Sequence, residues 1–261
     1  MIDLAVRPSQ IAVAISKDRA APGIRRDPFA VSRGLPDPVH ALAHRSGARE
    51  DRKRSHVTLA QKGYFCGADS LRTVGYTAAQ VIDLLDVGFD WRAKYGSWGL
   101  VSASDRLGGG VAHRSLAALR VLPLFSTRGG PDLLWAERVR YLSELVWAPD
   151  AILCNPHLRW VPLDASTLLV STGEAPDSAH VIVHLDALGR IQTVEAESDS
   201  IDSTAQRMSA ARRMRSVSRV SYSDYADTAG RCVPRRAKSI CYVAGQRVAE
   251  WECEITQWSF T

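Results

Sequence analysis

The sequence predicts an α+β fold built on a strongly curved antiparallel sheet. Three observations predict it. Segments with a period of two lie on both sides of the middle of the chain, at 55–125 and 158–258. The longest helical pattern, 131–146, lies between them, and turn-like sequences rather than helices separate most of the strand-like segments. Helices and strands segregated in this way favour an antiparallel sheet over alternating βαβ units.

The chain opens with a segment of different character. Residues 1–33 are rich in Arg, Pro and Ala and have weak periodicity, which predicts a poorly ordered or accessory N-terminal segment. No linker-like composition follows, so residues 34–261 are predicted to form a single domain. That domain begins with a short helix within 34–47, where prolines come first and Gly47 ends the pattern.

The first half of the domain predicts a series of strands. In 55–65, Val57 and Leu59 alternate with His56 and Thr58, as in a strand with one buried face. The segment 113–125 fits either a strand or a short helix. The other strand-like segments of this half are 71–82, 87–96 and 98–110.

The central helix is predicted from apolar residues spaced three and four apart in 131–146, beginning at Pro131. Arg140 and Glu144 are four residues apart and therefore share a face of this helix. Pro149 ends or kinks it, because proline has no N–H and its ring clashes with the preceding turn. A short second helix is predicted at 150–153.

The second half returns to strands. A tight turn at Asp186 to Gly189 and another at Ala244-Gly245 predict hairpins. The polar stretch 199–216 is predicted to be a loop, and the alternation of 251–258 predicts a strand with one wet face. The remaining strands are predicted at 158–164, 167–173, 180–189 and 190–198.

Composition narrows the function classes. The 261 residues are 46% hydrophobic with a net charge of +5, and basic residues gather at 52–54 and from Arg207 to Arg236. Such runs either bind phosphate groups or are solvated loop charges. No nucleic-acid motif accompanies them, so we interpret them as solvated and expect no nucleic-acid partner. The sequence leaves the oligomeric state open.

Cysteine usage and known motifs exclude several site classes. The five cysteines form no CxxC pair, which predicts no metal site and no disulfide scaffold. Gly108-Gly109-Gly110 has neither dinucleotide-fingerprint nor P-loop spacing, so no cofactor is expected; we interpret it as a loop or bulge. No apolar run approaches a transmembrane length, and no signal peptide is recognised. These features favour a cytoplasmic location.

The order of several motifs resembles uncharacterised bacterial families, the domains of unknown function DUF6920 and DUF6544. The most specific motif is Arg140-Tyr141-Leu142-x-Glu144-x-x-Trp147-x-Pro149. The supporting residues, in chain order, are Leu35-Pro36, Pro38-Val39, Gln61, Gly63, Phe89, Trp91, Ala93, Asp105, Gly108, Gly110, Leu158, Trp160, Asp164, Asp186, Gly189, Ile191, Tyr225, Gly230 and Pro234.

The resemblance implies a particular architecture. Members of these families are similar to lipoprotein-carrier half-barrels of the LolA and LppX type, in which the curved sheet wraps around helices and encloses an apolar cavity. This chain departs from the family pattern at 195–199, where an arginine is usual, and at 240–242, where a tryptophan is usual. If those positions line the cavity, its ligand differs from the ligands of its relatives.

Each candidate site residue has two interpretations. Arg140 and Glu144 are either polar anchors for a ligand or a structural clamp between helix and sheet. Asp105 is either a catalytic base or a turn cap. Aromatic residues of the motifs either fill the core or line a ligand site, and they are Trp91, Tyr141, Trp147, Trp160 and Tyr225.

Two functions follow from these candidates. The first is non-catalytic binding or carriage of an apolar small molecule or lipid in an enclosed cavity. The alternative is a cofactor-independent pocket enzyme, such as an isomerase, cyclase or hydrolase, that uses Asp105, Glu144 and Arg140 on such a molecule. No hydrolase signature is present, and the sequence leaves open whether a reaction is catalysed. A third possibility, a basic surface module for anionic partners, rests on the arginine-rich runs alone.

Overall fold

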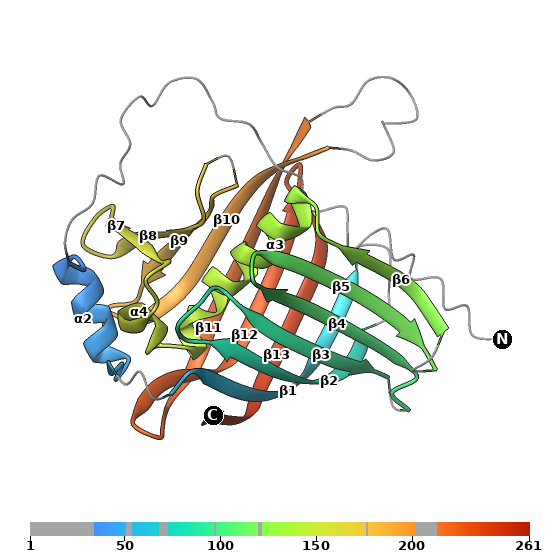
Figure 1. Cartoon of the computed structure of the whole chain (residues 1–261), viewed down its shortest axis with the longest axis horizontal. Helices are drawn as coiled ribbons and strands as arrows, with labels where there is room; N and C mark the ends of the chain where they lie inside the picture. Colours follow the sequence, from blue (N-terminus) through green and yellow to red (C-terminus); the bar gives the residue numbers. More distant parts are fainter. Residues whose placement is uncertain are drawn as a thin grey trace.

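The fold is a single antiparallel sheet of 13 strands that curves strongly on itself (Figure 1). The computed structural model describes residues 34–50, 54–67, 73–96, 98–119, 122–175, 177–201 and 213–261. The strand order is β6-β5-β4-β3-β2-β1-β13-β12-β11-β10-β9-β8-β7, so β6 and β7 are the two edges. The predicted curved antiparallel sheet is confirmed, whereas the segment 1–33 lies outside the described residues.

The first flank of the sheet contains the early strands, each paired with its neighbour in sequence. Gly109 and Gly110 both have positive φ and form the two-residue turn between β4 and β5, so the predicted loop or bulge is a hairpin turn. The undecided segment 113–125 forms two strands. The flank consists of β1 (His56–Gly67), β2 (Val74–Asp83), β3 (Phe89–Tyr95), β4 (Val101–Gly108), β5 (Val111–Ala118) and β6 (Leu122–Arg128).

The second flank contains the late strands. The turns predicted at Asp186 to Gly189 and at Ala244-Gly245 both connect adjacent strands. The loop predicted at 199–216 is wrong at both ends, because long antiparallel pairing continues through 201 and resumes at 213. The flank consists of β7 (Arg159–Pro162), β8 (Thr167–Thr172), β9 (Ala179–Leu185), β10 (Ile191–Ile201), β11 (Arg213–Thr228), β12 (Arg231–Val243) and β13 (Gln246–Phe260).

Pairing of β1 with β13 joins the two flanks into one sheet. The register runs from Val57 opposite Phe260 to Gly67 opposite Ala249, with a bulge beside Gln61. At position 63 this pairing requires glycine, because a Cβ there would meet the Glu252 carbonyl oxygen at 2.0 Å. Early and late segments of the chain therefore come together through backbone hydrogen bonds.

The helices are few and contact both flanks. Pro131 begins α3 (Pro131–Ser143), the 3₁₀ turn η1 (Glu144–Trp147) follows directly, and Pro149 precedes α4 (Ala151–Cys154). The helix α3 contacts β4 and β5 of the first flank and β8, β9 and β10 of the second, and η1 contacts β12. Another helix of the described residues, α2 (Asp37–Arg45), contacts α4 and β7.

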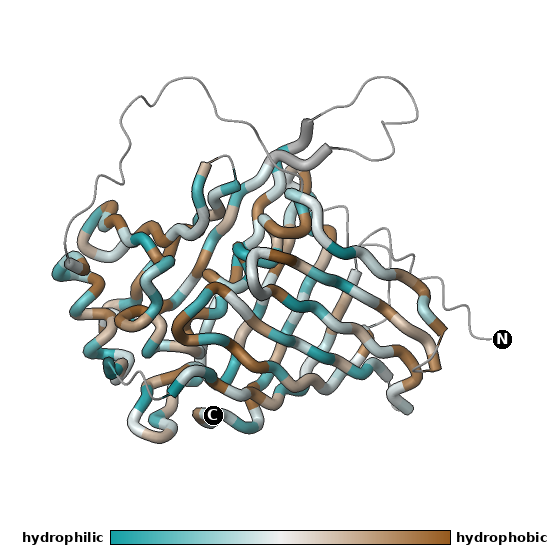
Figure 2. The backbone as a smooth tube through the Cα atoms, viewed as in Figure 1, coloured by the Kyte–Doolittle hydropathy of each residue, from teal (hydrophilic) through white to brown (hydrophobic). Residues whose placement is uncertain are grey.

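One face of the sheet forms the hydrophobic core together with these helices. Polar and apolar residues alternate along the strands, as the change of colour along each strand shows (Figure 2). In β3, Phe89, Trp91 and Ala93 are buried while Arg92 and Lys94 are exposed. We call the face that carries Trp91 the inner face and the opposite one the outer face.

Candidate functional site

A group of charged side chains in mutual contact lies where α3 and η1 meet the inner face of β2, β3, β4 and β5. Arg140 is at its centre and bridges two carboxylates. Its Nε donates to Glu144 Oε1 at 2.9 Å, and its Nη1 donates to Asp105 Oδ2 at 2.7 Å. The structure thus brings together all three residues predicted as catalytic, Asp105, Arg140 and Glu144.

The Arg140 guanidinium is also held by aromatic rings. Its central carbon lies 4.7 Å from the centroid of Trp91 and 4.9 Å from that of Phe89. Burial acts to lower the pKa of Arg140, but Glu144 and then Asp105 outweigh it and hold the pKa above its usual value. Arg140 is therefore a permanent, well-fixed cation inside the fold.

Arg114 of β5 makes the second cationic contact of the site. Its Nε donates to Asp105 Oδ1 at 3.2 Å, and its Nη2 donates to Glu137 Oε1 at 2.5 Å. Asp105 lies in the middle of β4 between two arginines, so its interpretation as a turn cap is wrong. Among the described residues, we call Asp105, Arg114, Glu137, Arg140 and Glu144 the charge cluster.

Glu137 is the most unusual member of the charge cluster. Its side chain is fully buried, and its Oε2 has no hydrogen-bond partner among the described residues. Burial raises the pKa of Glu137 to about 7, although the charge of Arg114 acts to lower it. A carboxyl group in such surroundings retains its proton far more readily than an exposed one.

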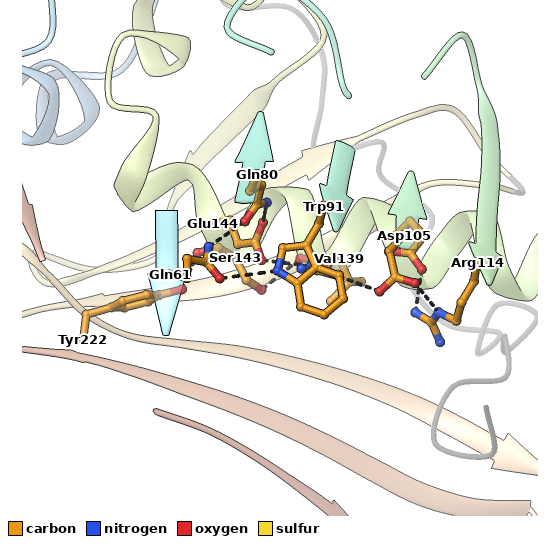
Figure 3. A network of polar contacts seen from close by, with 11 residues as sticks. Gln61, Gln80, Trp91, Asp105, Arg114, Val139, Ser143, Glu144 and Tyr222 are labelled. Carbon is orange, nitrogen blue, oxygen red and sulfur yellow. Dashed lines mark hydrogen bonds and ion pairs between the residues drawn. The ribbon is translucent and has the colours of Figure 1, made fainter. Parts of the chain in front are cut away.

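A chain of hydrogen bonds through neutral side chains extends the charge cluster toward the middle of the sheet. Gln80 donates to Glu144 Oε2 at 2.5 Å, Gln61 donates to Gln80 Oε1 at 2.8 Å, and the Trp91 indole donates to Gln61 at 3.4 Å (Figure 3). Both glutamines are buried. Both oxygens of Glu144 are therefore occupied.

The aromatic residues predicted to bind a ligand have structural contacts. The Tyr141 hydroxyl donates to Asp83 O at 3.0 Å, the Trp147 indole donates to Pro234 O at 2.9 Å, and the Tyr225 hydroxyl donates to Ile191 O. Trp160 is buried and its Nε1 has no partner in the described part of the chain. Trp91 lies beside Arg140, so it contacts the charge cluster.

Part of the inner face is accessible to solvent. Tyr95, Ala103, Val220 and Trp251 are only partly buried although they pack against the core. Phe65 and Trp251 lie on adjacent strands with ring centroids 4.5 Å apart, and the pairing register continues this row to Val220 on β11. We call the region formed by Phe65, Tyr76, Tyr95, Ala103, Val220 and Trp251 the inner surface; it is the partly accessible part of the inner face.

Two open hollows occur elsewhere on the sheet. One is lined by residues of β2 to β6 such as Asp90, Arg106 and His113. The other is lined by charged outer-face residues such as Lys62, Lys94 and Glu254, together with Tyr76. None of the five predicted ligand-binding aromatics lines either hollow. Neither hollow is the enclosed apolar cavity that the sequence analysis predicts.

Sequence reasoning missed Arg114, Glu137 and Tyr95. A signal for Arg114 was present, because a two-residue turn at Gly109-Gly110 places Arg114 opposite Asp105 in a hairpin. Glu137 carries no such signal, since burial of a charged helix residue depends on what packs over it. In the described ranges, no group of His, Cys, Asp and Glu is arranged to hold a metal ion, and no helix is long and apolar enough to span a membrane.

Comparison with known families decides the relationship. The profile described as "Family of unknown function (DUF6544)" matches residues 28–253. The chain belongs to DUF6544. This confirms the resemblance found in the sequence, which rested on the motif around Tyr141. No curated protein matches this member of DUF6544.

Several solved structures are similar to this DUF6544 chain. A domain named as an outer membrane lipoprotein-sorting protein, from Vibrio parahaemolyticus, has 10% identity and a TM-score of 0.45, covering 85% of this chain and 92% of its own. A LolA superfamily protein from Nitrosomonas europaea has 8% identity and a TM-score of 0.43, covering 85% and 93%. A DUF1329 protein from Desulfovibrio piger has 10% identity and a TM-score of 0.35, covering 86% and 94%.

Proposed function

We propose that this DUF6544 protein binds an apolar or amphiphilic small molecule, such as a lipid, on the inner surface of its curved sheet. The observation that carries the proposal is the partial exposure of Tyr95, Ala103, Val220 and Trp251 on a face that is otherwise core. Accessible apolar surface has a free-energy cost in water of about 25 cal/mol per Å². A ligand that covers this surface removes that cost.

The binding region differs from a closed cavity. The helix α3 forms one wall, because it contacts strands of both flanks, and the inner face of the sheet forms the other. In this proposal the sheet wraps around the central helix, and the ligand lies between them on the partly exposed strands. The two open hollows are excluded as the apolar site, because charged side chains from several strands line them.

The charge cluster gives the region a polar end. Ligand sites in proteins combine mostly apolar walls with a few convergent polar groups that fix orientation. Arg140 and Tyr95 are both partly exposed. Arg140 contacts Trp91, and Tyr76 lies between the rings of Trp91 and Tyr95. An amphiphile therefore matches the region better than a pure hydrocarbon.

The alternative function as an enzyme receives less support. Asp105 accepts hydrogen bonds from Arg114 and Arg140 on both oxygens, and Glu144 accepts from Arg140 and Gln80. All four carboxylate oxygens are thus already engaged by protein donors, which leaves neither group free to contact a reacting atom of a substrate. Non-catalytic binding remains the proposal.

The test begins with the ligand carried by the protein. Native mass spectrometry of protein purified from its own cells is expected to show a co-purifying apolar or amphiphilic molecule. After delipidation, the neutral fluorescent probe N-phenyl-1-naphthylamine is expected to bind. Val220→Arg places a charge on the inner face and is expected to weaken probe binding at least tenfold.

Ser221→Arg is the matched control, because Ser221 is the next residue of β11 and is exposed on the opposite face. Circular dichroism establishes that both variants are folded. Absence of both a bound molecule and probe binding, or equal effects of the two variants, would refute the proposed function.

A further inference from the structure

The charge cluster contains donors without acceptors. In the described part of the chain, Arg140 uses Nε and Nη1, and Arg114 uses Nε and Nη2, so Arg140 Nη2 and Arg114 Nη1 have no hydrogen-bond partner. The Tyr95 hydroxyl likewise has none. An unused N–H or O–H group next to a low-dielectric core is a strong recognition element.

These free donors are accessible to solvent. Among the described residues, the buried side-chain nitrogen and oxygen atoms that lack a partner are Glu137 Oε2 and Trp160 Nε1. The free atoms of Arg140, Arg114 and Tyr95 are not among them, and 24% of the Arg140 side chain and 20% of the Arg114 side chain are exposed. A small group arriving along the inner surface can therefore reach them.

The three donors lie in one region of the inner face. The two arginines bond the Asp105 carboxylate, one at each oxygen. Tyr95 lies four residues along β3 from Trp91, the residue opposite Asp105, and the charges of Asp105, Arg140 and Arg114 all act on its hydroxyl. Burial raises the pKa of the Tyr95 hydroxyl, and the charge of Asp105 adds to this effect. The hydroxyl thus remains protonated, and able to donate, at neutral pH.

We propose that Arg140, Arg114 and Tyr95 form a head-group subsite for an anionic oxygen group, a carboxylate or phosphate, of the amphiphile bound on the inner surface. This inference rests on the proposed function. Guanidinium groups are suited to it because their planar donors match both carboxylate and phosphate oxygens.

A cationic head group fits the same place poorly. Every oxygen of Asp105 and Glu144 already accepts a hydrogen bond, and the remaining oxygen, Glu137 Oε2, is buried. The groups that remain available to a ligand are therefore donors.

The apolar part of the ligand would extend from this subsite across the sheet. The rings of Tyr95 and Tyr76 have centroids 5.7 Å apart, and the next strand, β1, presents Gly63, which has no side chain to block the path. Beyond it lie Phe65 and Trp251. The polar head group of the ligand and its apolar chain thus each have a matching surface, and these two surfaces adjoin.

The experiment compares four ligands with the same twelve-carbon chain: dodecanoate, dodecyl phosphate, dodecan-1-ol and dodecylamine. Dissociation constants are measured with the delipidated full chain by displacement of N-phenyl-1-naphthylamine, below micelle-forming concentrations. At least one of the two acids is expected to bind about tenfold more tightly than the alcohol, because charge-assisted hydrogen bonds are formed with it alone. The two acids distinguish a carboxylate site from a phosphate site.

Two variants locate the effect. Tyr95→Phe keeps the ring and removes only the hydroxyl, and Arg140→Lys keeps the charge but removes the forked donor. Each is expected to reduce the preference for the acid over the alcohol at least threefold, with binding of the alcohol changed less than twofold. Arg106→Lys is the matched control, because Arg106 is next to Asp105 on β4 but faces outward and pairs with Asp90.

The outcomes separate the two proposals. If the alcohol binds but neither acid is preferred, if dodecylamine binds best, or if both variants keep the full preference, the head-group subsite is refuted and the proposed function stands. If none of the four compounds binds, both are refuted.

Discussion

Arg231 and Asp150 form an ion pair in which both side chains are completely buried. Arg231 Nε donates to Asp150 Oδ1 and Nη2 donates to Oδ2, each at 2.7 Å. Asp150 also accepts from the backbone N–H of Arg49, and the Arg231 guanidinium lies 4.8 Å from the ring centroid of Phe260. One bidentate contact thus connects β12, the start of α4, the segment after α2 and the end of β13.

Removal of one partner of this pair is expected to be strongly destabilising. Asp150→Asn leaves a buried guanidinium without its counter-charge, and we expect a loss of about 3–5 kcal/mol in the free energy of unfolding. Urea denaturation followed by circular dichroism measures it. Arg236→Met is the control: Arg236 is exposed and lies 3.9 Å from Asp224, so a change within about 0.5 kcal/mol is expected. Similar losses in both variants would contradict this account.

Trp147 is expected to be a stability residue rather than a ligand contact. Its indole N–H donates to Pro234 O, and its own carbonyl accepts from the Trp258 indole at 2.9 Å. Trp147→Phe leaves a cavity and removes the side-chain donor to the Pro234 carbonyl, so we expect a loss of about 2–4 kcal/mol in the free energy of unfolding. Trp98→Phe is the control, since Trp98 is 84% exposed and a change within about 0.5 kcal/mol is expected. Thermal unfolding separates the two variants, and an unchanged Trp147→Phe protein would disprove the assignment.

Gly63 is expected to tolerate no side chain. An alanine Cβ would meet Glu252 O at 2.0 Å and Cys253 Cα at 2.9 Å across the β1–β13 pairing. Because backbone rather than a flexible side chain lies in the way, Gly63→Ala is expected to cost about 1–3 kcal/mol or more. Gly108→Ala, where a Cβ meets nothing within 4 Å, is expected to be neutral. Denaturant midpoints test the pair; equal midpoints would show that the strands adjust freely.

Glu137 is expected to make stability depend on pH near neutrality. Burial raises the pKa of this carboxyl from 4.5 to about 7 in the folded protein, so the folded state binds its proton more tightly than the unfolded state does. The stability contribution is therefore fully present below about pH 4.5 and is lost as pH rises to about 7. Melting temperatures of the wild type should fall over this window relative to those of Glu137→Gln.

Glu174→Gln serves as the control for the pH experiment, because the Glu174 side chain is 87% exposed. This variant should follow the wild-type pH profile. A Glu137→Gln profile parallel to that of the wild type would show that folding does not raise the pKa of Glu137.

The environment of the arginines in the region 207–236 could be predicted from the sequence only in part. Arg215, Arg219 and Arg236 are exposed, as predicted for solvated charges, although they lie on strands rather than in a loop. Arg231, from the same region, is completely buried. Sequence cannot separate these cases, because a lone arginine in a strand is buried only if a distant carboxylate, here Asp150, is brought to it.

The amino-acid sequence by itself determined the curved antiparallel sheet, the position of α3, the turns at Asp186 to Gly189 and Ala244-Gly245, and membership in DUF6544. These features depend on residue periodicity, on turn chemistry and on local motifs, which act over a few neighbouring residues. The tertiary structure alone decided that β1 pairs with β13, that Arg114 and Glu137 join Arg140, and that part of the inner face remains accessible. Those facts depend on contacts between residues far apart in the chain, whose free energies no local pattern contains.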